Sequence, residues 1–143
     1  MRRVALILVT VYALVLPARA EDSPEADAKA VPPGIHQVFS GGYWMHGKDD
    51  GHYRIVVVQS GFEHISYRLF IQWIVIDQDN HDLKIVRTVP VVEINDLSGV
   101  ISELKPQFKL NNPPRFNVTI EGRDGKKRRY AITATPDGRY TIR

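Results

Sequence analysis

Residues 53–77 form the most apolar stretch that follows the first twenty residues, and they predict two long neighbouring strands. The run Ile-Val-Val-Val at 55–58 favours sheet over helix because its side chains are β-branched. Ser60-Gly61 is the expected turn, and His64, Ser66 and Arg68 predict a solvent-exposed face where the second strand begins. The odd positions of the second strand predict a continuous core face, which consists of Ile65, Tyr67, Leu69, Ile71, Trp73 and Val75.

The second half of the chain shows the same alternation in shorter runs. Residues 83–94 predict a strand, and Pro90 places part of it at an edge or bulge because proline cannot donate a ladder hydrogen bond. Residues 115–121 alternate cleanly, with Phe116, Val118 and Ile120 inward. Asp124-Gly125 predicts a hairpin turn, from which residues 129–135 return with Tyr130, Ile132 and Ala134 inward. Residues 136–138 predict another turn before a last strand with Tyr140 and Ile142.

One segment, residues 96–104, has helical spacing instead. Asn95 or Asp96 can cap its start, and Pro106 follows its end. Its apolar positions recur at i, i+3, i+4 and i+7 and predict one helical stripe, which consists of Leu97, Val100, Ile101 and Leu104.

These elements predict a mainly β fold. Seven or eight short strands with tight turns, and no alternation of strands with helices, favour an antiparallel meander. We expect a sandwich or an open barrel, with the short helix near 96–104 closing one side. Residues 35–143 are long enough for one such domain and too short for two.

The first 34 residues predict an export leader and a spacer. Two arginines precede an apolar run of thirteen residues, 4–16, and Ala18-Arg19-Ala20 is the small-x-small pattern of signal-peptidase sites. We therefore expect cleavage after Ala20, a periplasmic or secreted protein, and no transmembrane segment in the mature chain. Residues 21–34 are acidic and rich in alanine and proline, which predicts a disordered spacer.

Export changes the charge balance. The full chain has a net charge of +3, but without Arg2, Arg3 and Arg19 it has 16 basic and 16 acidic residues. The charges are unevenly placed, because residues 21–104 hold 6 basic and 13 acidic side chains and residues 105–143 hold 10 and 3. The chain contains no cysteine, which excludes disulfides, thiol redox chemistry and cysteine-ligated metals.

Two histidines are the first candidates for chemistry. His46 and His52 flank a turn predicted at 47–51, so in a hairpin they would lie roughly opposite each other, with Asp49 and Asp50 between them. Two imidazoles beside a carboxylate could ligate zinc or copper. The alternative is a pair of exposed histidines beside a polar turn.

The basic run at 126–129 is the most distinctive surface feature. Because it leads out of a hairpin turn, its charges should project from the tip, where they could meet an anionic envelope component or an acidic protein partner. The alternative is a strand edge protected from aggregation by charge. The export leader and the lack of interleaved aromatic residues argue against nucleic acid. The candidate residues are Arg123, Lys126, Lys127, Arg128 and Arg129.

Tyr43 and Trp44 follow two glycines and form a third candidate. Large aromatic side chains on a loop rim are common binding anchors. The alternative places them in the core of a first strand, and Trp73, within the predicted core face, is interpreted as structural.

Together these features predict a non-enzymatic binding or inhibitor-type module without a cofactor. No serine lies in a Gly-x-Ser-x-Gly elbow, and Glu63 and His64 are strand neighbours whose side chains would point apart. Two alternatives stay open: a metal carrier or metal-dependent enzyme that uses His46 and His52, and a structural envelope protein that associates with itself through a sheet edge.

Overall fold

The structure is a computed structural model that describes residues 28–77, 81–109 and 112–143. The predicted leader (1–20) and the first half of the predicted spacer (21–27) lie outside the described residues. Residues 28–30 form a single helical turn, and Pro32–Arg143 form one compact unit, which contains all the strands.

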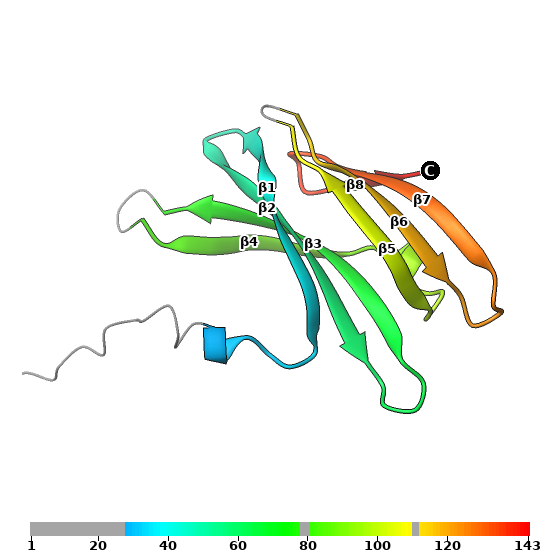
Figure 1. The fold of residues 1–143 in the computed structure, drawn as a ribbon. Coiled ribbons are helices and arrows are strands. Elements are labelled where there is room, and N and C mark those ends of the chain that lie inside the picture. The colour runs from blue at the N-terminus through cyan, green and yellow to red at the C-terminus, as the bar shows by residue number, and fades with distance from the viewer. Residues whose placement is uncertain (1–27, 78–80, 110–111) are drawn as a thin grey trace, which may run out of the picture. The chain divides into compact units, whose positions relative to one another are not determined.

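The protein is mainly β, with eight strands in two antiparallel sheets of four, as predicted (Figure 1). Sheet A contains β1 (Ile35–His46), β2 (Asp49–Ser60), β3 (Ser66–Ile76) and β4 (Leu83–Pro90). In each sheet the strand order follows the sequence order.

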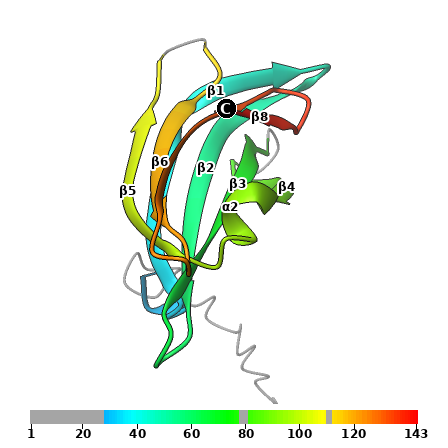
Figure 2. The same cartoon turned by 90° about the vertical axis from the view of Figure 1, so that its right-hand side faces the viewer.

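Sheet B contains the second half of the chain. Its strands are β5 (Val100–Gln107), β6 (Arg115–Glu121), β7 (Lys127–Ala134) and β8 (Tyr140–Ile142). The helix α2 (Val92–Asn95) joins the two sheets, and Figure 2 shows it beside β3 and β4.

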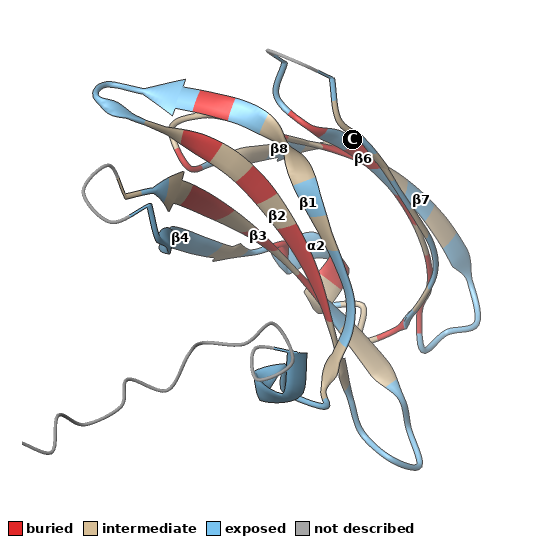
Figure 3. Cartoon of the chain, turned by 60° about the vertical axis from the view of Figure 1, so that its left-hand side comes forward, coloured by how far each residue is buried: buried red, intermediate tan, exposed pale blue. Residues whose placement is uncertain are grey.

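The core lies between the inner faces of the sheets. Sheet A contributes the odd positions of β2 and β3, and Figure 3 shows buried segments along both strands while β4 is almost wholly exposed. Sheet B contributes the predicted inward positions of β6 and β7, all of which are buried except the half-buried Tyr130. The fully buried members with the largest side chains are Trp73, Tyr53, Phe116, Ile55, Leu69, Ile71, Ile94, Ile120 and Ile132.

The register between β2 and β3 differs from the expected one. A turn at Ser60-Gly61 would pair His52 with Phe70, but residues 61–65 form a longer loop and His52 lies opposite Ile74. Gly61 adopts a φ of 88°, and a Cβ there would lie 2.2 Å from the carbonyl oxygen of His64. Only glycine fits this close return of the backbone.

The predicted helix at 96–104 is wrong, because Val100–Gln107 is strand β5. Ile101 lies opposite Ile120 and Leu104 lies opposite Val118, so both face the core although they are three residues apart. A register shift between Ile101 and Glu103 causes this spacing, because a β-bulge adds one residue to an alternation of period two. The bulged strand therefore imitates the i, i+3 spacing of a helix.

Strand β4 lies at the edge of sheet A, as Pro90 predicted, and it ends at Pro90. The helix α2 follows directly after it. Asn95, expected as a helix cap, instead completes the edge of β3. Its Oδ1 accepts from the Leu69 N–H at 2.7 Å, and its Nδ2 donates to the Leu69 carbonyl oxygen at 3.2 Å. One side chain thus serves both backbone groups of a buried strand residue that β4 no longer covers.

Contacts at three places hold the sheets together. The Trp73 indole N–H donates to the Thr135 carbonyl oxygen at 3.0 Å, and Arg87 donates to the carbonyl oxygen of Asp137 at 2.9 Å. Where β3 begins, the Tyr67 N–H donates to the Gly99 carbonyl oxygen at 2.9 Å. On the far side, Gly41 lies against the Phe108 ring, where a Cβ would come within 2.8 Å.

Candidate functional site

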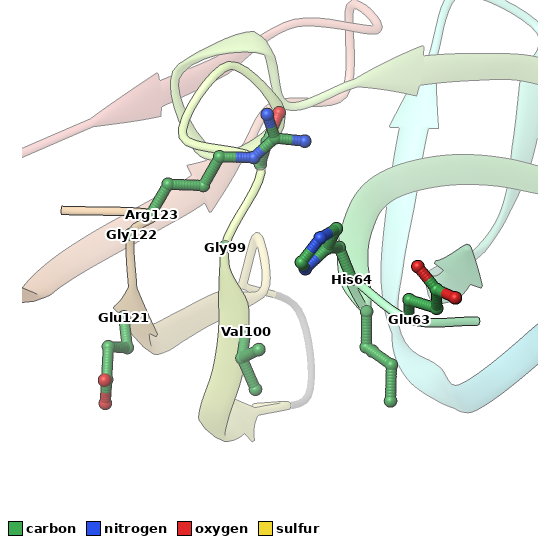
Figure 4. Close-up of a pocket in the computed structure, with 9 residues that line it drawn as sticks. Glu63, His64, Gly99, Val100, Glu121, Gly122 and Arg123 are labelled. Atoms are coloured by element: carbon green, nitrogen blue, oxygen red, sulfur yellow. The ribbon is translucent and has the colours of Figure 1, made fainter. Parts of the chain in front are cut away.

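An open groove of about 640 Å³ lies where the β2–β3 loop meets the start of β5 and the end of β6. Figure 4 shows His64 on the β2–β3 side and Arg123 on the β6–β7 side, with Gly99 and Val100 between them. The Glu63 and Glu121 carboxylates lie at the two outer sides of this view. We call this region, residues 61–65, 98–100 and 121–129, the two-hairpin end.

Phe62 is the most exposed large apolar side chain of the two-hairpin end. It is 97% exposed, and two apolar lining residues of the groove, Ile65 and Val100, are also exposed. A fully exposed phenylalanine beside other exposed apolar groups is typical of a contact surface. Phe62 is not among the residues predicted from the sequence, where the available indication was a large apolar residue directly after a turn glycine.

The hairpin turn predicted at Asp124-Gly125 is present, and it organises the basic run. Asp124 accepts from the Lys126 N–H at 3.1 Å and from both terminal nitrogens of Arg128, at 3.0 and 2.6 Å. The hydrogen bond with Arg128 is the largest cause that lowers the pKa of Asp124 to about 2. Arg128, one of the predicted binding residues, is therefore engaged in the turn itself.

The other cations of the run are exposed. Lys127 has a distant partner, Glu121, at 3.9 Å. Among the described residues, Arg123 and Lys126 have no ion pair, and Arg129 has none within 4 Å. The tip of β6 and β7 thus keeps a positive surface after its internal pairs are formed.

The uneven charge of the sequence becomes a dipole in space because the two sheets do not interleave. Residues 100–143, which contain sheet B, hold ten basic and four acidic side chains. Residues 35–99, which contain sheet A, hold five basic and eight acidic side chains. Sheet B is therefore the positive side of the domain, and the two-hairpin end includes half of its basic residues.

His46 and His52 do not lie opposite each other. The turn is shorter than predicted, since β2 already starts at Asp49, and His46 pairs with Asp49. His52 lies three residues farther along β2, beside the register shift between Gly41 and Trp44, and Trp44 donates its indole N–H to the His52 carbonyl oxygen at 3.0 Å. Partial burial is the main cause that lowers the pKa of His52. The described part of the chain contains no group of three or more His, Cys, Asp or Glu side chains that could hold a metal ion.

Tyr43 and Trp44 have different environments. Trp44 is buried, which agrees with the alternative interpretation that it is a core residue of the first strand. Tyr43 is exposed, and its hydroxyl donates to Asp50 Oδ2 at 3.1 Å. Of this aromatic pair, only Tyr43 is available to a partner.

The two predicted contact surfaces lie far apart. Tyr43 and His46 lie in β1 beside the β1–β2 turn, where β2 begins, and residues 61–65 follow the other end of the twelve-residue strand β2. His46 lines shallow grooves with Pro136 and Asp137, and it shares none with the basic run. The predicted binding residues therefore lie in two separate groups.

The groove shows no hydrogen-bonded pair of nucleophile and base among its described residues. Ser98 and His64 both line it, but no hydrogen bond among the described residues joins His64 to Ser98, Glu63 or Glu121. Ser98 has a φ of 46°, a left-handed conformation that non-glycine residues seldom adopt. This strain is the groove's one unusual backbone feature, and it comes without a hydrogen-bonded nucleophile and base.

Within the ranges that the structure describes, no helix has the length and apolar character needed to cross a membrane. Comparisons with protein-family models, curated proteins and solved structures find no match to this chain.

Proposed function

We propose that this protein is an exported, non-enzymatic binding module that contacts an anionic partner through the two-hairpin end. The observation that carries the proposal is the set of exposed cations at Arg123, Lys126, Lys127 and Arg129, beside an open groove on the positive side of the domain. Because Asp124 already engages Arg128, the other cations of this set are the ones that a partner would meet.

The hairpin is well suited to present charge. Asp124 fixes the turn through one backbone and two side-chain hydrogen bonds, so the neighbouring cations start from an ordered backbone. A partner then orders fewer groups on binding, which improves affinity. Clustered charge of one sign also accelerates encounter with an oppositely charged surface.

The first prediction concerns the triple variant R123Q/K126Q/K127Q. We expect its affinity for soluble poly(glycerol phosphate) at low ionic strength to fall about tenfold, because three exposed cations are removed from the contact. Fluorescence anisotropy with labelled polymer at several salt concentrations measures the effect, and the dependence on salt should weaken as well.

A matched control removes three cations from the opposite ends of the strands. Lys48 lies in the β1–β2 turn, and Lys109 and Arg115 flank the β5–β6 connection. K48Q/K109Q/R115Q has the same net charge as the first variant, and we expect it to lose much less affinity. Equal losses in both variants would show a general charge effect and would contradict a local site.

We also propose a second role, self-association through the edge strand β1, which a separate observation favours. Residues 35–46 contain no acidic residue, lysine, arginine or proline. The other edges carry common protections against pairing, since β4 contains Lys84, Arg87 and Pro90, β5 contains Pro106, and β8 has only three residues. An edge strand of this kind can pair with the same strand of a second copy without strong charge repulsion.

The second prediction tests this pairing with Val38→Lys. Val38 is 48% exposed on β1, opposite Val56. We expect the unmodified protein to show a concentration-dependent dimer in sedimentation equilibrium, and Val38→Lys to be monomeric at the same concentrations, because a lysine would put charge on the otherwise uncharged edge strand. Val92→Lys, at an equally exposed valine on α2, should leave the dimer intact. A concentration-independent monomer for the unmodified protein would rule out the second role.

A further inference from the structure

The two-hairpin end combines apolar and cationic groups, and the proposed function uses only the cations. Phe62, Ile65 and Val100 are 97%, 44% and 41% exposed on this end, and none of them is needed to attract an anion. A soluble polyanion offers no apolar phase that could bury a phenyl ring. A partner that engages both kinds of group would supply negative charge and a nonpolar environment together.

We propose that the anionic partner is the surface of a lipid bilayer, into which Phe62 inserts. This inference rests on the proposed function, because it uses the same cations and names what they meet. Anionic headgroups would contact Arg123 and Lys126, while the acyl region just below would take up the ring of Phe62. Phenyl rings and basic side chains are the groups that interfacial membrane contacts combine.

The position of Phe62 in the fold favours insertion. It lies in the loop between β2 and β3, and Figure 1 shows this loop projecting beyond the strand ends of sheet B. Gly61, with its positive φ, brings the backbone close to the His64 carbonyl oxygen, so the loop is short and closed. The apolar tip is therefore presented on a short loop, closed at its base by the pairing of Ser60 with Ser66.

The two-hairpin end carries charges of both signs, and the ion pairs among them decide the sign of the charge that is left unpaired. Glu121 lies 3.9 Å from Lys127, and Asp124 is paired with Arg128. Glu63 is the acidic residue of the loop. The two-hairpin end as a whole thus keeps more positive than negative charge, which suits an anionic bilayer and disfavours a neutral one. The exposed cations that remain are Arg68, near the start of β3, with Arg123, Lys126 and Arg129.

The test compares vesicles with a soluble anion. The probes are vesicles of phosphatidylglycerol and phosphatidylcholine, vesicles of phosphatidylcholine alone, and soluble poly(glycerol phosphate). We expect co-sedimentation with the anionic vesicles only, and we expect Phe62→Ala to lower that affinity about tenfold while affinity for the soluble polymer stays the same. Leu83→Ala removes an exposed apolar side chain from β4 and should change neither affinity.

A second measurement follows the ring itself. Trp44 and Trp73 are buried, so a Phe62→Trp variant adds the only indole that a bilayer could reach among the described residues. We expect its emission to shift to shorter wavelength with anionic vesicles and to be quenched by lipids brominated on the acyl chain.

The outcomes separate the two proposals. If Phe62→Ala binds anionic vesicles as tightly as the unmodified protein, or if the emission of the Phe62→Trp variant does not shift, the bilayer inference is overturned and an anionic polymer becomes the partner. If R123Q/K126Q/K127Q binds vesicles and polymer as well as the unmodified protein does, the proposed function fails too.

Discussion

Replacing Trp73 by alanine is expected to destabilise the domain by about 3–5 kcal/mol, the usual cost of removing a large aromatic side chain from a core. Trp73 is 1% exposed and packs edge-on against Tyr53, with ring centroids 5.8 Å apart. Its indole N–H also donates to the Thr135 carbonyl oxygen in the turn before β8, so one side chain links both sheets. Urea unfolding followed by far-ultraviolet circular dichroism measures the loss.

Trp73→Phe separates the two contributions. Phenylalanine keeps much of the apolar volume but cannot donate to Thr135, so we expect a smaller loss than for alanine. The residues around Trp73 are tightly buried. The Tyr53 hydroxyl there has no hydrogen-bond partner among the described residues, and burial raises the pKa of Tyr53 to about 12. If Trp73→Ala unfolded at the same urea concentration as the unmodified protein, the packing of the two sheets through this residue would be refuted.

Replacing Asn95 by alanine is expected to cost about 1–3 kcal/mol, the penalty for leaving buried backbone groups without partners. The Leu69 N–H would lose its acceptor, although the Leu69 carbonyl oxygen keeps a bond from the Val91 N–H at 2.9 Å. Native-state hydrogen exchange of the Leu69 amide, together with urea unfolding, measures the effect, and this amide should exchange faster than its neighbours in β3.

Asp96→Ala provides the control for Asn95. Asp96 is the next residue, is exposed, and makes no side-chain hydrogen bond among the described residues. We expect a change within about 0.5 kcal/mol, as for ordinary surface substitutions. Equal effects of the two substitutions would mean that Asn95 acts through the helical turn and not through β3.

Much of the fold could be predicted where alternation and turn chemistry agree locally. Residues 115–121 alternate without interruption, and Asp124-Gly125 supplies the turn, so β6 and its inward residues were predicted correctly. Pro90 likewise indicated the edge position of β4. These features depend on neighbours in the sequence, which is why one sequence is enough for them.

Bulges and long-range packing account for the errors. The bulge at Ser102 gave β5 a helical spacing, and the β1–β2 turn is shorter than the sequence suggested, so His46 pairs with Asp49 and not with His52. A bulge has no distinctive composition of its own here, and its effect is seen only when the partner strand is known.

The candidate site was predicted in part. The basic run at 126–129 is a local feature, and its position at a hairpin tip follows from the turn. The meeting of Arg123 with His64 in one groove could not be predicted, since the two residues are far apart in the sequence and the groove forms only when the two sheets pack. The charge dipole was visible in the sequence, and the separation of the sheets gives it a direction in space.

The separation of the two sheets along the sequence also has a consequence for how the chain folds. Each sheet forms from one uninterrupted segment, residues 35–90 for sheet A and 100–142 for sheet B, and every strand pairs with its sequence neighbour. A chain that is released from its N-terminus can therefore pair all four strands of sheet A before any strand of sheet B exists, because such local contacts form fastest. The early half would be a sheet with one uncovered apolar face and an unprotected edge at β1. Until sheet B closes over it, the partly formed protein is most vulnerable to aggregation.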